Sequence, residues 1–154
     1  MSFHVILFQP EIPPNTGNVI RLAANSGATL HLVRPLGFNL SDRALRRAGL
    51  DYADLAAVQV HDNWPACRQA LAATRLFAVT TKGTTRYDMP RFAAGDAFLF
   101  GSESSGLPAD VLAELMSENK LRLPMVAGNR SLNLANAVSI VIYEAWRQIA
   151  FPGS

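Results

Sequence analysis

The last third of the chain reads Leu121-Arg-Leu-Pro-Met125, then Val126-Ala-Gly-Asn-Arg130, then Ser131-Leu-Asn-Leu-Ala-Asn-Ala-Val-Ser-Ile-Val-Ile-Tyr-Glu-Ala-Trp146. This order predicts a short apolar strand, a polar turn and a long helix. The helix begins with Ser and Asn side chains, which are good helix caps, and then becomes apolar on nearly every face. We therefore expect its first turn to border a ligand pocket and the rest to be buried against more than one surface.

The composition is typical of a single domain with a large core. The chain has 154 residues, which fits one domain spanning residues 1–154. Hydrophobic residues make up 49% of the chain and charged residues only 17%, so the sequence is rich in core and poor in charged surface. We expect some of the apolar surface to contact a second subunit.

Net charge and cysteine content bear on the cellular compartment of the protein and on the kinds of molecule it can bind. A formal net charge of +2 and a pI near 9.0 are compatible with a nucleic-acid partner without requiring one. Cys67 has no second cysteine to pair with, and the N-terminal segment lacks the regions of a signal peptide, so the protein is expected to be cytoplasmic. The longest apolar stretch, residues 137–149, is too short for a bilayer and carries charged residues, which predicts no membrane span.

Apolar runs alternate with amphipathic segments along the whole chain. The runs predict strands at residues 3–8, 29–33, 56–60, 76–80 and 97–100. The segments between them predict helices at residues 19–26, 42–48, 63–73 and 107–116, while residues 81–86 read as a polar loop. This alternation predicts an α/β fold with a mostly parallel sheet flanked by helices.

The first predicted helix carries a polar stripe. Asn15 or Thr16 is a candidate N-cap, and Asn18, Arg21 and Asn25 follow at spacings that place them on one face. An ordinary solvated face explains this pattern, and so does a functional cation at Arg21 beside the Asn-rich turn. The residues alone leave both explanations open.

Other basic residues are candidate phosphate contacts. Arg43, Arg46 and Arg47 gather on one side of a predicted helix, and Lys82 and Arg86 lie in the polar loop. A solvated surface accounts for the same pattern, because no aromatic side chains are interleaved for base stacking.

Common catalytic motifs do not fit the sequence. Gly101 and Gly106 have the spacing of half a P-loop, but Leu-Pro follows where Lys and a hydroxyl residue are required, and no Gly-x-Gly-x-x-Gly follows a strand. The scattered residues His4, His31 and His61 do not combine with Cys67 into a metal-ligand spacing, so no metal site is predicted.

Three polar segments remain, at residues 15–21, 101–106 and 126–133, each after an apolar strand. In an α/β sheet, ligands bind at the carboxyl ends of the strands. Glycines in the last two segments let a flat ligand approach the backbone, while Ser131 and Asn133 add donors and acceptors.

Five blocks of sequence, in order, resemble the SPOUT (trefoil-knotted) RNA methyltransferases, and among them the small tRNA wobble-position 2'-O-methyltransferases called TrmL or YibK-like. The blocks are Pro10-Glu-Ile-Pro-Pro-Asn-Thr-Gly-Asn-Val-Ile-Arg21, Leu45-Arg-Arg-Ala-Gly-Leu-Asp-Tyr52, Thr80-Thr-Lys-Gly83, Phe100-Gly-Ser-Glu-Ser-Ser-Gly-Leu-Pro108, and Arg130-Ser-Leu-Asn-Leu-Ala-Asn-Ala-Val138 with Tyr143-Glu-Ala-Trp-Arg-Gln148. The resemblance spans nearly the whole chain. It implies a C-terminal trefoil knot, a feature so rare that periodicity could not reveal it.

The resemblance also implies a cofactor and an assembly. S-adenosylmethionine is expected to bind in loops around Val79, Gly101, Leu123 and Ser131, with no metal, and the chain is expected to form a homodimer through its C-terminal helix. The helix residues Val138, Ile142, Tyr143 and Trp146 are then expected to pack on both the chain's own sheet and the partner, so that Ile142→Glu would weaken both assembly and cofactor binding.

By the same resemblance, Arg21 is expected beside the ribose hydroxyl that is methylated. It would act either as the proton acceptor or as a cation that stabilises the developing alkoxide and grips a phosphate, since an arginine is seldom neutral. Asn15, Glu103 and Asn133 resemble the family's other pocket residues, although Glu103 could equally cap a backbone amide.

The implied substrate is the ribose of the wobble nucleotide, cytidine or uridine 34, in leucine tRNAs. The five basic residues Arg43, Arg46, Arg47, Lys82 and Arg86 are the expected RNA contacts. Two other functions remain open: a knotted methyltransferase that acts on ribosomal RNA, and a nonenzymatic RNA-binding protein of the same fold.

Overall fold

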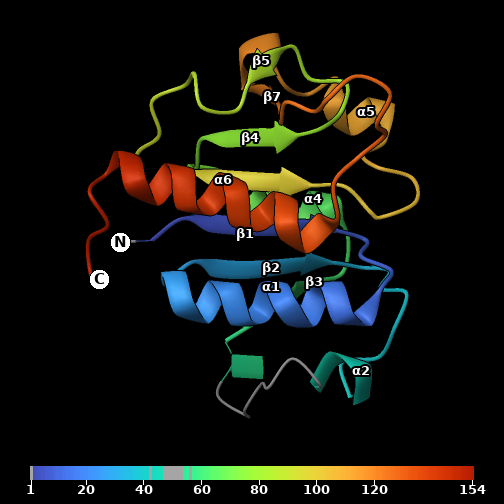
Figure 1. Ribbon diagram of the computed structural model, residues 1–154. Coiled ribbons are helices and arrows are strands. Elements are labelled where there is room, and N and C mark those ends of the chain that lie inside the picture. Colours follow the sequence, from blue (N-terminus) through green and yellow to red (C-terminus); the bar gives the residue numbers. More distant parts are fainter. Residues whose placement is uncertain (1, 42, 47–53, 56) are drawn as a thin grey trace.

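The computed structural model describes residues 2–41, 43–46, 54–55 and 57–154, and its described strands form one parallel sheet (Figure 1). The sheet order is β3–β2–β1–β6–β4–β7–β5. The strands are β1 (His4–Phe8), β2 (Thr29–Val33), β3 (Gln59–His61), β4 (Leu76–Val79), β5 (Thr85–Arg86), β6 (Ala97–Phe100) and β7 (Lys120–Arg122). The helices are α1 (Pro13–Ser26), α2 (Arg43–Arg46), α4 (Trp64–Ala70), α5 (Ala109–Leu112) and α6 (Leu134–Gln148), with a 3-10 turn η1 (Ser117–Asn119). The predicted α/β class with a parallel sheet is confirmed.

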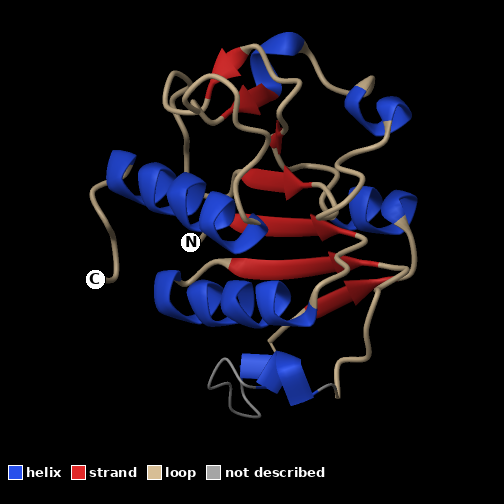
Figure 2. Cartoon of the chain, turned by 45° about the vertical axis from the view of Figure 1, so that its right-hand side comes forward, coloured by secondary structure: helices blue, strands red, loops and turns tan. Residues whose placement is uncertain are grey.

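Helices cover the sheet on both faces. α1 and α6 lie side by side on one face, and α4 lies on the other (Figure 2). The side chains of β1 divide between the two faces of the sheet. Val5 and Leu7 belong to the core cluster under α1 and α6, whereas Ile6 and Phe8 belong to the cluster under α4. Alternate side chains of a strand point to opposite faces, so a continuous apolar run is what a doubly covered strand requires.

One strand is interleaved between two that precede it in the sequence. β7 pairs with both β4 and β5, so the chain must cross β7 on its way from β4 to β5. The backbone N–H of Thr80 donates to the carbonyl of Leu121 across this crossing, over 2.9 Å. A Cβ at Gly83 would lie 2.7 Å from the Leu121 backbone, so the crossing requires a glycine there. The trefoil knot stays a prediction, and this interleaving supports it.

The start of α1 differs from the prediction. The helix begins at Pro13 rather than Val19, its N-cap is Ile12, and neither Asn15 nor Thr16 caps it. The reason is the Pro-Pro pair: proline has no N–H to lose in the first turn and its fixed φ suits a helix. The Asn15 side chain therefore does not cap α1 and forms hydrogen bonds with Glu103 and Asn133 instead.

Other helices and strands also differ in their limits from the ranges predicted from the sequence. α4 and α5 are shorter than predicted, and the segment read as a polar loop contains the edge strand β5. β3 lies at residues 59–61 rather than 56–60. The predicted helix at residues 42–48 is seen as α2 alone, and its remainder lies outside the described residues.

The long C-terminal helix carries buried and exposed apolar residues. Val138 and Ile142 are buried in the chain's own core, whereas Tyr143 is 43% exposed and Ile140 is 38% exposed. Ile142 is therefore the wrong position at which to test assembly, because a charge there would disrupt the protomer itself. Among the described helices, none combines the length and apolarity needed to cross a bilayer.

Candidate active site

A cavity of about 560 Å³ opens at the carboxyl ends of β4, β6 and β7. Its walls are formed by residues 79–82, 100–107 and 130–134, together with Ile12, Asn15, Leu123, Met125 and Ala137. The N-terminal ends of α1 and α6 both lie at this edge of the sheet (Figure 1). The volume is in the range of small-molecule and cofactor sites, and the position is the one expected for a ligand in an α/β sheet.

The structure brings together most of the predicted pocket residues. Two loops and two strand ends supply the four expected cofactor residues Val79, Gly101, Leu123 and Ser131, and all four line the cavity. The predicted catalytic residues Asn15, Glu103 and Asn133 line it as well.

Glu103 holds the first turn of α1. Its carboxylate accepts hydrogen bonds from the backbone N–H groups of Glu11, at 2.9 Å, and Ile12, at 2.7 Å. Free N–H groups at a helix start favour an anion, and the bond to a charged acceptor is stronger than a neutral one. The capping explanation for Glu103 is confirmed, and the residue fixes where α1 meets the cavity.

Asn15 and Asn133 continue the same hydrogen-bonded chain. The Asn15 side chain donates to Glu103 at 3.3 Å, and its oxygen accepts from the Asn133 amide at 2.9 Å. The Asn133 oxygen in turn accepts from the backbone N–H of Asn136, at 3.2 Å, and so caps α6. We call Glu103, Asn15 and Asn133 the polar relay, because they tie the starts of both helices to one wall of the cavity.

The loop at residues 101–106 is tightly closed. Ser102 and Gly106 form an isolated bridge, with the Gly106 N–H donating to the Ser102 carbonyl at 3.0 Å. A Cβ on Gly101 would lie 2.3 Å from the Gly106 backbone, and Gly106 itself has a φ of +66°. Only glycine tolerates these two positions without a shift of the chain, so the loop keeps bare backbone beside the cavity.

Glu11 holds this loop from the opposite side. Its carboxylate accepts from the hydroxyl of Ser104 at 2.6 Å and from the Ser104 N–H at 3.1 Å. These hydrogen bonds lower the pKa of Glu11. Neither residue was singled out from the sequence, although Glu11 lies only two residues before the Pro-Pro helix start.

The cavity walls separate into apolar and cationic parts. Val79, Leu123 and Ala137 offer apolar surface, while Lys82 and Arg130 bring positive charge to the same opening. Arg130 is the first residue of the fifth block that resembles the family, but the sequence alone assigned it no role. Its position directly before the Ser-Leu-Asn helix start is the signal that could have found it.

Arg21 does not line the cavity. It lies on the exposed side of α1, six residues beyond Asn15, which corresponds to about 9 Å along a helix. The expectation that Arg21 meets the reacting hydroxyl therefore stays a prediction, and it requires a site that is larger than this cavity in a single chain.

The remaining predicted RNA contacts are dispersed. Arg43 is exposed on α2, Arg46 belongs to that helix with its side chain outside the description, and Arg47 lies outside the described residues. Arg86 forms an exposed ion pair with Asp88, which raises the pKa of the guanidinium and offsets its charge. Lys82 is the member of the set that borders the cavity.

The histidines are not scattered in space. His4, His31 and His61 lie on the neighbouring strands β1, β2 and β3 and form a hydrogen-bonded row, and Cys67 on α4 lies close to it. Linear spacing failed to predict this because parallel strands bring together residues 27 and 30 positions apart. The sequence-based statement that these residues do not combine is wrong in this respect.

The interleaved parallel sheet and the cavity at its carboxyl edge place the chain in the SPOUT methyltransferase fold class. A solved structure described as "Structural insights into the 2-OH methylation of C/U34 on tRNA" matches with a TM-score of 0.90 and 48% identity, covering 96% of each chain. An AdoMet-bound rRNA methyltransferase from Sinorhizobium meliloti matches with a TM-score of 0.82 and 25% identity, covering 96% of this chain and 57% of that one.

The sequence comparisons identify the family. The model of the SpoU rRNA Methylase family matches residues 2–143, and the chain belongs to that family. A tRNA (cytidine(34)-2'-O)-methyltransferase from Burkholderia ambifaria is 57% identical over 153 residues, covering 98% of each chain. A protein of the same name from Escherichia coli (strain K12) is 52% identical over 151 residues, covering 98% of this chain and 96% of that one.

Proposed function

We propose that this chain transfers the methyl group of S-adenosylmethionine to the 2'-oxygen of nucleotide 34, cytidine or uridine, in tRNA. The observation that carries the proposal is the cavity, which gathers all four expected cofactor residues and the polar relay at one edge of the sheet. Near-full-length identity of 52–57% to proteins named for this reaction supports it. Leucine tRNAs are the expected substrates.

The residues present fit this cofactor. Gly101 and Gly106 keep the loop free of side chains where backbone amides and carbonyls can read an adenine edge. Val79, Leu123 and Ala137 supply apolar surface for a flat ring, and Ser131 adds a hydroxyl near its rim. When bound, S-adenosylmethionine supplies an activated methyl group on a sulfonium.

The chain must align the ribose oxygen and remove its proton. Transfer would exchange the bond from sulfur to the methyl carbon for a bond from the 2'-oxygen to that carbon, and the chain's own groups would have to take up or release the hydroxyl proton. Arg21 either accepts that proton or stabilises the developing alkoxide as a cation. Because Arg21 lies outside the cavity of one chain, either role requires a partner subunit or the bound tRNA to complete the site.

A homodimer through α6 is part of the proposal. Ile140 and Tyr143 are three residues apart on this helix and leave apolar surface exposed. Tyr143 also packs edge-on against Trp146, with ring centroids 5.5 Å apart, and Trp146 packs against Phe151. Aromatic clusters of this kind are favoured at subunit interfaces.

A methyl-transfer assay tests the reaction. Purified protein is incubated with labelled S-adenosylmethionine and a leucine tRNA transcript, and the labelled nucleotide is mapped. The matched control is the same tRNA with 2'-deoxycytidine at position 34, which lacks only the acceptor oxygen. Label at nucleotide 34 that disappears with the deoxy substrate is the expected result.

Other outcomes separate the competing functions. Label in ribosomal RNA but not in tRNA would favour the ribosomal methyltransferase, and RNA binding without label in any RNA would favour the nonenzymatic protein. In the same assay, Arg21→Ala is expected to lose methyl transfer while retaining cofactor affinity. Near-normal turnover of this variant would remove Arg21 from the mechanism.

Assembly is tested at an exposed position. Tyr143→Glu places a charge on the proposed interface and is expected to shift the dimer towards monomer, as measured by light scattering during gel filtration. Met116→Glu is the matched control, because Met116 is exposed and lies outside α6. A Tyr143→Glu protein that stayed dimeric would place the interface elsewhere.

A further inference from the structure

Three imidazoles form a row across the half of the sheet that does not line the cavity. His4 Nδ1 lies 3.0 Å from His31 Nε2, and His31 Nδ1 lies 2.9 Å from His61 Nε2. The ring of His31 stacks on that of His61, with centroids 5.2 Å apart. We call these three residues the histidine row. His31 uses both of its ring nitrogens within the row, so its ring orientation is fixed from both sides.

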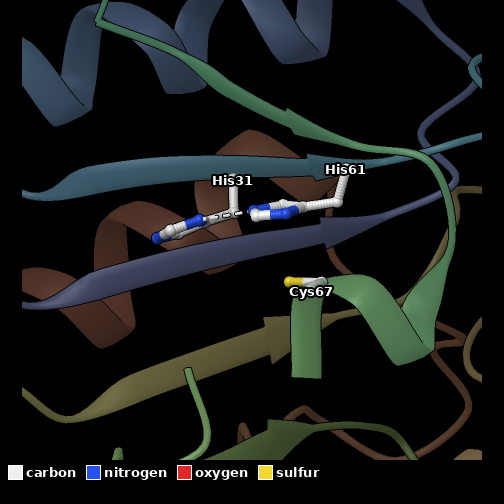
Figure 3. Close-up of side chains that lie close together, drawn as sticks. All are labelled: His31, His61 and Cys67. Atoms are coloured by element: carbon white, nitrogen blue, oxygen red, sulfur yellow. Dashed lines mark hydrogen bonds between the residues drawn. The ribbon is translucent and has the colours of Figure 1, made fainter. Parts of the chain in front are cut away.

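A thiol completes the cluster from the covering helix. Cys67 on α4 is fully buried, and one ligand atom each from His31, His61 and Cys67 lie within 4.8 Å of one another. Figure 3 shows the Cys67 sulfur and the two imidazoles approaching the same space from different elements. Among the described residues, this is the group of His, Cys, Asp and Glu side chains close enough to share a metal ion.

We propose that His31, His61 and Cys67 form a binding site for copper(I), held by two imidazole nitrogens and one thiolate. Two histidines and one cysteine in a trigonal arrangement are a known copper donor set, and thiolate selects soft ions. The site is independent of the proposed methyl transfer, because none of its three residues lines the cavity.

The charge of the site favours a monovalent ion. Burial raises the pKa of the Cys67 thiol to about 11, and nearby Arg68 opposes this shift. Binding replaces the thiol proton, which leaves to solvent, by the ion, and a sulfur–copper bond forms with no change of oxidation state. One thiolate and copper(I) sum to zero charge, whereas a divalent ion would leave an uncompensated positive charge in a buried place near Arg68.

The spacing of the three ligand atoms is close to what an ion requires. Metal–nitrogen and metal–sulfur bonds of about 2.0 and 2.3 Å place trigonal ligand atoms about 3.5 to 3.8 Å apart. His31 Nδ1 and His61 Nε2 are 2.9 Å apart and must separate to admit an ion. One ligand atom from each of the three residues already lies within 4.8 Å of the other two, so the shifts required are small.

His4 supports the site without belonging to it. Its Nδ1 lies against His31 Nε2, so a proton on His31 Nε2 can be donated to His4 while His31 Nδ1 faces the ion. Such outer contacts fix the tautomer of a metal-ligating histidine. His61 is partly exposed on the edge strand β3, which provides a route for the ion.

A competition titration tests the site. Metal-free protein, reduced with ascorbate, is titrated into the coloured complex of copper(I) with bathocuproine disulfonate. The wild type is expected to withdraw one equivalent of copper, whereas Cys67→Ser and His61→Gln are expected to bind at least about a hundredfold more weakly. His4→Gln removes only an outer contact of His31 and should keep the stoichiometry of one copper, with affinity lowered by about tenfold.

X-ray absorption at the copper edge keeps the test independent of the variants. The wild-type complex is expected to show two nitrogen neighbours and one sulfur neighbour. Failure to withdraw copper, unchanged withdrawal by folded Cys67→Ser and His61→Gln proteins, or a purely sulfur environment from exposed residues such as Met89 would each overturn the proposal. Tighter retention of zinc(II) than of copper(I) in a parallel titration would overturn the charge argument.

Discussion

The polar relay and the histidine row are both chains of three hydrogen-bonded side chains, but they differ in their surroundings. The relay joins residues 88 and 118 positions apart in the sequence, borders an open cavity and holds two helix starts. The row joins residues 27 and 30 positions apart on three neighbouring strands, and His31 at its centre is buried. The relay borders a cavity large enough for a cofactor, whereas the row borders the proposed ion site.

The difference follows from where each set sits on the sheet. The relay lies beyond the carboxyl ends of the strands, where loops and helix N-termini leave backbone donors unpaired. The row lies on the strands, where the backbone is paired and burial favours neutral imidazoles. Burial, with the nearby His4 and His61, lowers the pKa of His31 to about 4. Four substitutions or titrations test this contrast, beginning with the largest expected effect.

Gly101→Ala should damage the cavity side most. The added Cβ would lie 2.3 Å from the Gly106 backbone, which cannot move without opening the loop. We expect a loss of about 3 kcal/mol in the free energy of unfolding, measured in urea, and loss of S-adenosylmethionine binding by calorimetry. Ser117→Ala, at an exposed residue that does not line the cavity, is the control. Unchanged cofactor binding by Gly101→Ala would mean that the bare loop does not form the site.

Glu103→Ala should come next. It removes the carboxylate that accepts from the Glu11 and Ile12 N–H groups and leaves those donors at the edge of the cavity. We expect a loss of about 2 to 3 kcal/mol in the free energy of unfolding, together with reduced methyl transfer. Glu118→Gln, at an exposed carboxylate in η1, is the control and should change neither. Wild-type stability in Glu103→Ala would show that the relay does not hold α1.

The fold was largely readable from the sequence, and the relay was only partly readable. β2 and β6 were predicted at their observed limits because a short apolar run between turn residues leaves few alternatives. Asn15, Glu103 and Asn133 entered through the family resemblance, and the cavity brings them together as implied. Their pairing joins residues 88 and 118 positions apart, which no local pattern encodes.

The histidine row was missed for a related reason. His31 and His61 were judged by their distance along the chain, but the register of β2 with β3 decides where their side chains meet. Cys67 joins them because α4 packs across those strands. Metal-ligand spacings in sequence detect sites built on one loop or helix, and they fail for sites assembled across parallel strands.

The row should make the metal-free protein less stable in mild acid. Burial lowers the pKa of His31 from 6.5 to about 4 in the folded chain, so the unfolded state binds more protons between these two pH values. The stability that neutral His31 contributes is therefore fully present above pH 6.5 and is lost progressively as the pH falls towards 4. From pH 7.5 to pH 5 the loss should be about 2 kcal/mol, measured by urea unfolding in the presence of a chelator. The slope should flatten in His31→Gln, and an equally steep slope in that variant would assign the effect to other groups.

The smallest expected effects come from two helix caps, one in each region. Asn63 caps α4, accepting from the Ala66 N–H at 2.8 Å, while Asn133 caps α6, accepting from the Asn136 N–H at 3.2 Å. Each Asn→Ala change should cost about 1 kcal/mol of unfolding free energy. Only Asn133 also donates to Asn15, so methyl transfer should fall in Asn133→Ala and not in Asn63→Ala, measured as the rate at saturating cofactor. Equal rates in the two variants would reduce Asn133 to a helix cap and would separate the relay from the chemistry.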